Sequence, residues 1–356
     1  DVAPSRGLGD VYKRQNQETS VYTKYSIYFI GAIMKKIIDD IRLIYKCCSL
    51  YYEDNMSQQE ISETLQISRP SVARMIKSGR RSGIVKIEIK NPDNLMFANM
   101  ERELEKKFGL EEVVIAAANS TEIGPNIINE NLAQEMAKFL TRIAEDREYI
   151  GVTMGMTLRN LTHANLSNIE KLKCTFVPIV GGIGESRYDI HSNYIAMAFA
   201  NIFKADCLQF FAPLVFSKPD LLNDFLQEES MQGILKSFNK ISTVIMGIGI
   251  PDRAHSTILK AGYINEEMFD TFVKQGAVGD IAMQFFDKDG NVEKFNVFNK
   301  LVSGMPIEKL KKIRRRIGVA TGKIKADSVV GAIKGGFVNI LIIDSECAQA
   351  LLNYEE

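Results

Sequence analysis

The sequence predicts an α/β protein with an N-terminal helix-turn-helix unit and a larger, Rossmann-like α/β domain. Residues 56–90 form a pattern of two short capped helices, a basic segment and a strand. From residue 113 onward, apolar runs alternate with helical patterns, which is typical of a mainly parallel sheet covered on both faces. The length of 356 residues exceeds that of one small domain and favours two or three.

The first 33 residues look foreign to the fold. The opening DVAPSRGLGDVYKRQ resembles translated vector or adapter sequence. The apolar run at 25–33 is much shorter than the roughly 20 residues that a membrane span needs. We therefore expect residues 1–33 to be a non-native or disordered leader, Met34 to be a plausible true start, and no segment to cross a membrane.

An amphipathic helix is predicted at 35–54, and it should pack on the helix-turn-helix pair as its first helix. Apolar side chains follow each other at steps of three and four residues, which places them on one helix face. They are Ile37, Ile41, Ile44, Cys48 and Tyr51 or Tyr52. Together with the chain up to the break at 91–93, this helix completes a predicted DNA-binding domain at 34–92.

The first helix of the pair begins after Ser57. A serine N-cap with Glu60 three residues later is the pattern of a capping box. Ile61 and Leu65 are four residues apart and make one apolar face. Residues 66–68 form the predicted turn.

The second helix begins after Ser68, and Pro70 suits its first turn because the missing N–H has no partner there. Val72 and Ile76 should face inward, which leaves four residues off that face. These are Arg69, Ser71, Arg74 and Lys77. Beyond the glycines at 79 and 83, Ile84, Ile87 and Ile89 indicate a short strand.

Charge agrees with a DNA contact in this segment. Residues 69–90 hold seven basic side chains and one acid, whereas the whole chain has 44 of each sign. A local basic segment on a neutral protein favours phosphate contact at one place. A capped helix pair with merely solvated charges is the alternative, and the turn spacing, the basic edge and the strand together disfavour it. The predicted DNA-binding residues are Ser57, Gln58, Ser68, Arg69, Pro70, Ser71, Arg74, Lys77, Arg80 and Arg81.

Cysteine and histidine usage argues against a metal or a cofactor. The five cysteines form no C-x-x-C pair, and their odd number favours reduced, buried thiols in a cytoplasmic protein. The three histidines have no metal-like spacing to any cysteine, so each is expected to be structural or at the surface.

A charged helix is predicted at 95–108, inside a linker that spans 93–110. Leu95, Met96, Met100, Leu104 and Phe108 are its apolar residues. They would pack on the core or, at a domain junction, on a second subunit. The remaining residues, 111–356, form the predicted larger α/β domain.

Seven apolar runs are predicted to be buried strands because they are rich in β-branched residues. They are VVIAAA, YIGVTM, CTFVPIV, CLQFFAP, TVIMGIGI, IGVATG and NILIID. Helices are expected between them at 130–144, 194–203, 221–238, 265–274 and 328–334. The turn residues 287–291 suggest a hairpin or an antiparallel edge.

Several strands end in glycine clusters, at 151–157, 181–184, 247–249, 276–280 and 318–322. In a doubly wound sheet, ligands bind outside the carboxyl ends of the strands. Exposed backbone N–H groups there would suit a phosphate or another anion. Tight packing explains any single cluster equally well, but five clusters favour a common pocket. No dinucleotide fingerprint, P-loop, nucleophile elbow or H-E-x-x-H motif is present.

Six segments between about residue 37 and residue 352 carry a resemblance: LYYEDNMSQQEISETLQISRPSVARMIKSGRRSGIVKIEI, GVTMGMTL, GGIGESRYD, CLQFFAPLVF, the run from VIMGIGIP to GAVGDIAMQFFDKDG, and IGVATGKIKADSVVGAIKGGFVNILIIDSECAQALL. Through them the chain resembles the SorC family of sugar-responsive bacterial transcriptional regulators. The resemblance implies an N-terminal winged helix-turn-helix and, at 111–356, a sugar-binding effector domain similar to ribose-phosphate isomerases, glucosamine-phosphate deaminases and CoA transferases. It also implies a sugar or phosphorylated-sugar effector, double-stranded operator DNA as a partner, and a homotetramer.

The same resemblance implies a set of effector contacts. They are Gly151, Thr153, Gly155, Met156, Thr157, Gly181, Gly182, Ile183, Gly247, Ile248, Gly249, Gly279, Asp280, Gly322 and Lys325. Three positions depart from the family pattern: Gln66 replaces a usual turn glycine, Met156 a polar or basic residue, and Thr321 the first glycine of the last loop. The hydroxyl of Thr321 would bond the effector or cap the following helix.

Two functions are compatible with these features. The first is a regulator whose affinity for operator DNA depends on a sugar or a phosphorylated sugar. The second is a sugar-phosphate isomerase or deaminase-like enzyme of the same fold, with Asp280 as its acid/base carboxylate. No histidine lies within twenty residues of Asp280, and the DNA-binding segment favours the regulator, so no catalytic residue is predicted.

Overall fold

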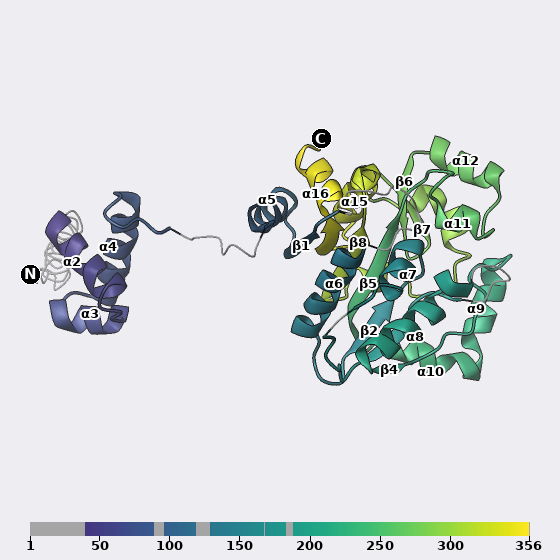
Figure 1. Cartoon of the computed structure of the whole chain (residues 1–356), viewed down its shortest axis with the longest axis horizontal. Coiled ribbons are helices and arrows are strands. Elements are labelled where there is room, and N and C mark those ends of the chain that lie inside the picture. The colour runs from purple at the N-terminus through teal and green to yellow at the C-terminus, as the bar shows by residue number, and fades with distance from the viewer. Residues whose placement is uncertain (1–39, 89–95, 119–128, 167, 183–187, 356) are drawn as a thin grey trace, which may run out of the picture. The chain divides into compact units, whose positions relative to one another are not determined.

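The computed structural model describes residues 40–88, 96–118, 129–166, 168–182 and 188–355. The chain divides into two compact units, Asp1–Pro92 and Asp93–Glu356, which are treated separately below (Figure 1). The predicted leader at 1–33 lies outside the described residues. Among the residues described, no helix combines the length and the apolar character needed to span a membrane.

The described part of the first unit consists of three helices around a small core. They are α2 (Ile41–Tyr52), α3 (Gln58–Leu65) and α4 (Arg69–Arg81). The core side chains are Ile44, Cys47, Cys48, Ile61, Val72, Met75 and Ile76. The predicted inward positions on both helices of the pair are confirmed, apart from Leu65, which is only half-buried.

Capping explains where α3 and α4 begin. The Glu60 N–H donates to Ser57 Oγ at 3.3 Å, and the Ser57 N–H donates to a Glu60 carboxylate oxygen at 2.7 Å, so the predicted capping box is confirmed. These bonds to Ser57 lower the pKa of Glu60. Ser68 caps α4 by accepting from the Ser71 N–H at 3.4 Å, with Pro70 in the first turn.

Gln66 ends α3 in the left-handed conformation, with φ 53° and ψ 40°. A side chain there costs about 1 kcal/mol, because its Cβ approaches the following carbonyl oxygen. Gln66→Gly should therefore stabilise the first unit by up to about 1 kcal/mol in chemical denaturation. Gln59→Gly, inside α3, should destabilise the unit by about 1 kcal/mol. Equal effects of the two substitutions would contradict strain at Gln66.

Two predictions for the ends of the first unit are wrong. The helix predicted at 35–54 does not run through Asp40, because Asp40 is extended and its carboxylate accepts from the Arg42 and Leu43 N–H groups at the start of α2; residues 35–39 lie outside the described residues. The Ile41 side chain is 71% exposed, so it lies off the buried face, and Ile37 lies outside the described residues. The described residues 84–88 form no strand: Ile84 and Val85 pack against the core of the first unit, and the Val85 N–H donates to the Gly79 carbonyl at the end of α4; Ile89 is not described.

The second unit is built on a mostly parallel sheet in the order β1-β9-β8-β5-β2-β3-β4. Its parallel strands are β1 (Glu112–Ala116), β2 (Tyr149–Val152), β3 (Thr175–Pro178), β4 (Asp206–Cys207), β5 (Ile241–Gly249), β8 (Arg315–Ala320) and β9 (Ile340–Asp344). The antiparallel pair β6 (Ala277–Ile281) and β7 (Gln284–Asp287) attaches to the end of β5. Every predicted strand is present, although β4 has only two residues, of which Cys207 alone belongs to the predicted run.

Helices cover both faces of the sheet (Figure 1). The helices are α5 (Ala98–Phe108), α6 (Glu130–Ile143), α7 (Met156–Thr162), α8 (Ser192–Phe203), α9 (Pro219–Gln227), α10 (Glu229–Ser237), α11 (Thr257–Lys260), α12 (Glu266–Lys274), α13 (Asn296–Asn299), α14 (Ile307–Leu310), α15 (Ala326–Lys334) and α16 (Ser345–Leu352). Short 3₁₀ turns lie at η1 (Tyr188–Ile190), η2 (Glu293–Phe295) and η3 (Lys323–Lys325).

Successive strand residues enter two separate cores. Val244 and Met246 of β5 belong to the core that includes residues of α5, α10, α12, α15 and α16. Ile245 belongs to the core that includes residues of α6, α7 and α8. Both faces of the sheet are therefore buried, and the predicted α/β class is confirmed.

Three local predictions need correction. The helix expected at 221–238 is two helices, because Glu228 is extended between α9 and α10. The linker helix begins at Ala98, Met96 is 80% exposed, and Leu95 lies outside the described residues. The predicted turn at 287–291 and the predicted antiparallel edge are both present, but the β6–β7 hairpin turns at Ala282 and Met283, both with positive φ, whereas the turn at Asp287 leads from β7 into η2.

Candidate functional site

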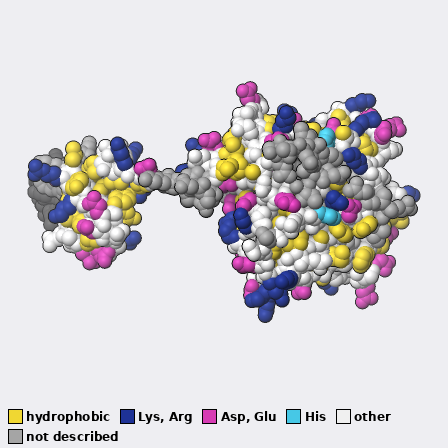
Figure 2. Space-filling model, in the orientation of Figure 1, with side chains coloured by type: hydrophobic (Ala, Val, Ile, Leu, Met, Phe, Trp, Pro, Cys, Tyr) yellow, Lys and Arg dark blue, Asp and Glu magenta, His cyan; other side chains and the backbone are white. Residues whose placement is uncertain are grey.

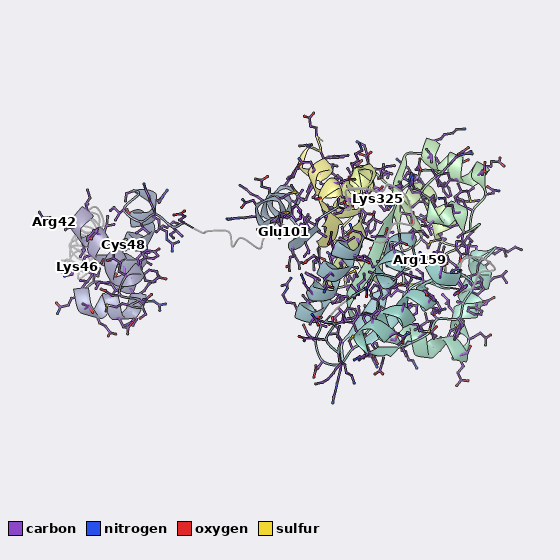
Figure 3. The ribbon with its side chains drawn as sticks, viewed as in Figure 1. Arg42, Lys46, Cys48, Glu101, Arg159 and Lys325 are labelled. Carbon is purple, nitrogen blue, oxygen red and sulfur yellow. The ribbon has the colours of Figure 1, made fainter. Side chains whose placement is uncertain are left out.

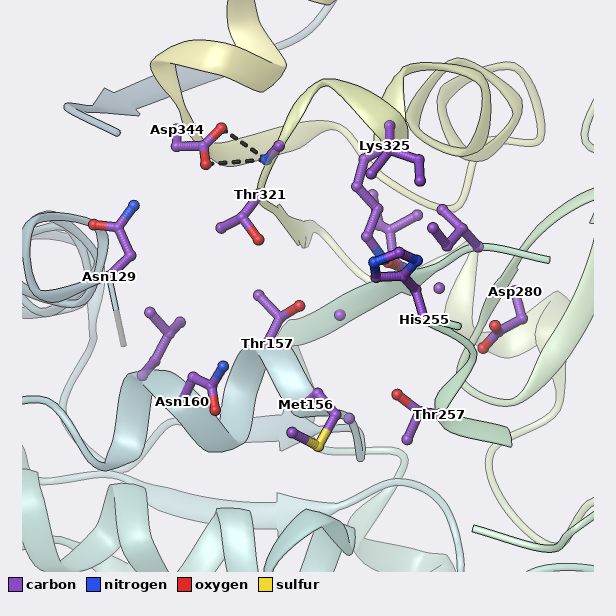
Figure 4. Close-up of a pocket in the computed structure, with 18 of the residues that line it drawn as sticks. Asn129, Met156, Thr157, Asn160, His255, Thr257, Asp280, Thr321, Lys325 and Asp344 are labelled. Carbon is purple, nitrogen blue, oxygen red and sulfur yellow. Dashed lines mark hydrogen bonds between the residues drawn. The ribbon is translucent and has the colours of Figure 1, made fainter. Parts of the chain in front are cut away.

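A cavity of about 230 Å³ lies at the carboxyl ends of the parallel strands of the second unit (Figure 4). Its walls come from the loops and helix starts that follow β2, β5, β8 and β9, together with the β6–β7 turn. Nine of the predicted effector contacts line it: Gly155, Met156, Thr157, Gly247, Ile248, Gly249, Asp280, Gly322 and Lys325. The topology thus brings together segments that are up to 170 residues apart, such as 155 and 325.

The other predicted contacts do not line the cavity, and close packing explains their small side chains. A Cβ on Gly151 would lie 2.8 Å from Ile179 Cγ2, and one on Gly279 would lie 2.7 Å from the Phe286 ring. Gly181 and Gly182 pack in the same way against Ser303 and the start of α8. Thr153 is buried, and its hydroxyl accepts from the Gly247 N–H at 3.4 Å. Ile183 lies outside the described residues.

Asp280 depends on the glycine opposite it. Gly249 and Asp280 are paired residues of β5 and β6, and a Cβ on Gly249 would overlap the Asp280 carboxylate. The glycine therefore leaves the space in which this carboxylate stands at the cavity wall (Figure 4). The sequence shows both residues, but only the β5–β6 register shows that one requires the other.

Lys325 and Asp280 are the two charged groups whose pKa values shift most strongly at the cavity. Burial raises the pKa of Asp280 to about 6, and nearby Lys325 opposes the rise. Burial lowers the pKa of Lys325 to about 8, and Asp280 opposes the fall. The Lys325 ammonium also donates to the Ile248 carbonyl, which fixes its direction. Both charged forms are therefore poorly solvated and suited to polar ligand groups.

Asp344 is a cavity residue that the sequence analysis missed. Both of its carboxylate oxygens accept from the Gly322 N–H at 3.0 Å, and one also accepts from the Cys347 N–H at 2.9 Å (Figure 4). Burial raises the pKa of Asp344. The Gly322 N–H, which we expected to help hold an anion, thus already bonds a carboxylate of the chain. An acid at the end of a predicted strand was an available signal.

Polar side chains complete the cavity wall. Asn129, Asn160, Thr257, Thr321 and His255 all line it (Figure 4). His255 bonds Asp252 through Nδ1 and was expected to be structural or at the surface, so its place at the cavity is a further finding. Thr321 faces the same space, as one of its two predicted roles requires.

A half-buried ion pair holds α7 in place beside the cavity. Arg159, labelled in Figure 3, donates through Nε to Asp189 of η1 at 2.7 Å and through Nη1 to Asn160 Oδ1 at 3.2 Å. The Gly155 N–H donates to the Ile190 carbonyl at 3.1 Å. The start of α7, which carries Met156 and Thr157, is therefore fixed by η1.

In the first unit, most of the predicted DNA-binding side chains are exposed. Ser57, Ser68, Arg69, Pro70, Arg74, Lys77, Arg80 and Arg81 are exposed, and Gln58 is half-buried. Figure 2 shows Lys and Arg side chains at the surface of this unit. The Arg80 guanidinium donates to the Tyr52 hydroxyl and lies over that ring, 5.6 Å from its centre.

Ser71 is the exception, since it is only 7% exposed. Its Oγ lies 2.9 Å from that of Ser68 and accepts from Arg74 at 3.4 Å. The prediction that Ser71 faces the major groove is wrong, because the first turn of α4 buries it beside Ser68. Ser71 instead accepts a hydrogen bond from Arg74, so it helps to orient that side chain.

Comparison with known proteins agrees with both units. The family model described as "Putative sugar-binding domain" matches residues 94–353. The sorbitol operon regulator of Klebsiella pneumoniae is 32% identical over 321 residues, which cover 88% of this chain and 98% of that protein. The deoxyribonucleoside regulator of Bacillus subtilis is 29% identical, with coverage of 88% and 97%. The transcriptional regulator LsrR of Escherichia coli K12 is 30% identical, with coverage of 85% and 92%.

Solved structures give the same result. The full-length sorbitol operon regulator SorC of Klebsiella pneumoniae matches with a TM-score of 0.65 at 30% identity, covering 88% of this chain and 99% of that one. A DeoR family regulator of Listeria monocytogenes matches with a TM-score of 0.63 at 27% identity, covering 71% and 98%.

A helix-turn-helix unit joined to an α/β domain with a cavity at its strand ends defines a ligand-responsive transcriptional regulator. The matched relatives and structures narrow this class of regulator to one family. The chain belongs to the SorC family of sugar-binding transcriptional regulators.

Proposed function

We propose that α3 and α4 bind operator DNA and that a sugar or a phosphorylated sugar in the cavity controls this affinity. The observation that carries the proposal is the Asp280–Lys325 pair beside the glycine loops at the strand ends. Asp280 accepts hydrogen bonds from sugar hydroxyls, and Lys325 bonds an anionic end or a further oxygen. Among the described residues, three carboxylates and one ammonium line the cavity, which fits a ligand with many hydroxyl donors and at most one anionic end.

Thermal unfolding against a panel of hexoses, pentoses, their alditols and the monophosphates of each tests this proposal. A ligand that binds only the folded state stabilises it by about 2.7 kcal/mol at a hundredfold excess over Kd. The compound that stabilises the chain most should also change its affinity for operator DNA. A panel without any stabilising compound would refute a sugar effector.

Effector affinity should depend on pH as a bell-shaped curve. Below about pH 6, Asp280 gains a proton and no longer accepts as a carboxylate. Above about pH 8, Lys325 loses its proton and no longer donates as a cation. The two limits belong to the coupled pair, and calorimetric titration from about pH 5 to pH 9 measures them. A flat profile would show that neither charge contacts the effector.

Arg74 is proposed to read a base. Because it is exposed on α4, Arg74→Ala should cost about 1–3 kcal/mol of operator discrimination if it contacts a guanine. Fluorescence anisotropy with operator and random duplexes measures this difference. Arg42→Ala, an exposed arginine on α2, is the matched control and should leave discrimination unchanged. Equal weakening on both duplexes would show that Arg74 contacts only phosphate.

We further propose a homo-oligomer, most simply a tetramer, that binds repeated or palindromic half-sites. One short recognition helix reads too few bases alone, and paired helices read half-sites about 34 Å apart. A monomer in sedimentation at micromolar concentration, with and without DNA, would contradict this.

An isomerase or deaminase activity is the second candidate, because Asp280 and His255 place two acid/base groups at one cavity. The named relatives are regulators, which favours control over catalysis. We therefore propose that the purified chain does not turn over sugar phosphates. Detection of product by nuclear magnetic resonance would overturn that statement.

A further inference from the structure

Helix α5 covers the open edge of the sheet with side chains instead of a strand. On that edge, β9 is the one described strand that pairs with β1. The outward N–H groups of Val113 and Ile115 donate to the carboxylates of Glu105 and Glu101, at 3.0 and 2.9 Å (Figure 3 labels Glu101). Alternate residues of a strand direct their backbone groups to the same side, so β9 cannot reach these two.

The spacing of the two carboxylates matches the strand. Four residues of a helix rise about 6 Å, and alternate residues of a strand lie about 6.6 Å apart. One helical turn therefore places one carboxylate on each outward N–H group, with α5 antiparallel to β1. Leu104, between them in sequence, is fully buried in the core.

The same helix also binds the end of α16. The Lys107 ammonium donates to the carbonyls of Leu351, Leu352 and Tyr354, at 3.2, 2.8 and 2.7 Å. These carbonyls lie at the C-terminal end of α16, where a cation is also favoured by the helix dipole. Glu101, Glu105 and Lys107 are called the α5 clasp below.

The α5 clasp binds β1 and α16, and the opposite end of each of these elements reaches the cavity. Ala118, two residues beyond β1, lines the cavity, as do Asp344 and Glu346 at the start of α16. The Ala118 N–H donates to Ser345 Oγ at 3.1 Å, which joins the two at that end. In sequence, α5 is the first described helix after the DNA-binding unit.

The Glu101 carboxylate of the α5 clasp lies where burial disfavours its charged form. Burial raises the pKa of Glu101, the Ile115 N–H opposes the rise, and the neighbouring carboxylates Glu105, Glu135 and Glu112 add to it. The Ile115 N–H is the backbone group that favours the charged form of Glu101, so a shift of β1 that lengthened this bond would disfavour the carboxylate.

We propose that the α5 clasp transmits the state of the cavity to the DNA-binding unit, through β1 and α16. This rests on the proposed function, since it assumes a sugar effector at the cavity. Glu101, Glu105 and Lys107 act as positioning residues, and none of them lines the cavity.

The test compares Lys107→Ala with Lys106→Ala, a neighbouring exposed lysine on the same helix. The probe is the panel compound that stabilises the full chain most, and the readout is operator affinity by anisotropy. In Lys107→Ala, the probe should bind within about twofold of its wild-type Kd while its effect on operator affinity falls at least about fivefold, the lower end of usual coupling. Lys106→Ala should respond as the wild type does. Two variants with wild-type responses would overturn the proposal.

Amide exchange on the full chain provides a second arm that needs no sugar. Glu101→Ala with Glu105→Ala should speed exchange at Val113 and Ile115, whereas Glu103→Ala, exposed on the same helix, should not. Unchanged exchange at both amides would overturn the clasp itself. If no panel compound stabilises the wild type, the proposed function fails, while this arm still decides whether the clasp exists.

Discussion

Replacing Lys325 with alanine is expected to abolish the response to the effector while leaving effector-free operator binding nearly intact. Lys325 supplies the cation nearest Asp280, and its ammonium is fixed by the Ile248 carbonyl. Removing the cation from a charge-assisted contact that the bound effector encloses costs about 2–5 kcal/mol of effector affinity, roughly thirtyfold or more. The Asp280 carboxylate then loses the opposing charge, its pKa rises further, and at neutral pH more of it is protonated.

Lys323→Ala is the matched control, since Lys323 lies in the same short turn but is exposed and does not line the cavity. Thermal unfolding with the best panel compound and operator anisotropy with and without it measure both variants. A Lys325→Ala protein that still responds at the wild-type effector concentration would show that the effector binds elsewhere. Loss of effector-free DNA binding as well would assign Lys325 a structural role.

The sequence predicted the elements better than the contacts between them. Apolar runs such as NILIID and VIMGIGI predict strands, because a strand that is buried on both faces of a sheet needs apolar side chains at successive positions. The capping box was equally predictable, since its two hydrogen bonds join Ser57 and Glu60, which are only three residues apart. The turn at Ala282 and Met283 was not, because neither residue favours positive φ and only the packing around the hairpin imposes it.

The cavity was predictable as a place but not as a set of residues. Parallel strands end at one edge, so glycine clusters after them indicated the correct region. The same clusters also contain glycines that serve packing, such as Gly151 and Gly279, and the sequence does not distinguish the two uses. Asp344 and His255 were missed as cavity residues because their role depends on which loops the sheet order brings together.

A second large effect is expected in the first unit. Gly79 is buried in α4, and a Cβ there would overlap Cys48 Sγ of α2 and contact Ile44 at 3.5 Å. Overpacking a core costs about 1–3 kcal/mol, and a small unit has little stability to lose. Gly79→Ala should therefore lower the unfolding temperature of the first unit. Apparent operator affinity should fall in proportion to the fraction of that unit that is unfolded, and effector binding should not change.

Cys48→Ala identifies the cause, because it removes the sulfur that the new methyl group would meet. In the Gly79→Ala, Cys48→Ala double variant, stability should recover relative to the sum of the single changes, with a coupling of about 1 kcal/mol or more. Gly233→Ala serves as control: no atom lies within 4 Å of its Cβ position in α10, so it should stabilise the second unit by about 0.5–1 kcal/mol. If the two losses of stability were additive in the double variant, contact with Cys48 would not be the cause of the destabilisation by Gly79→Ala.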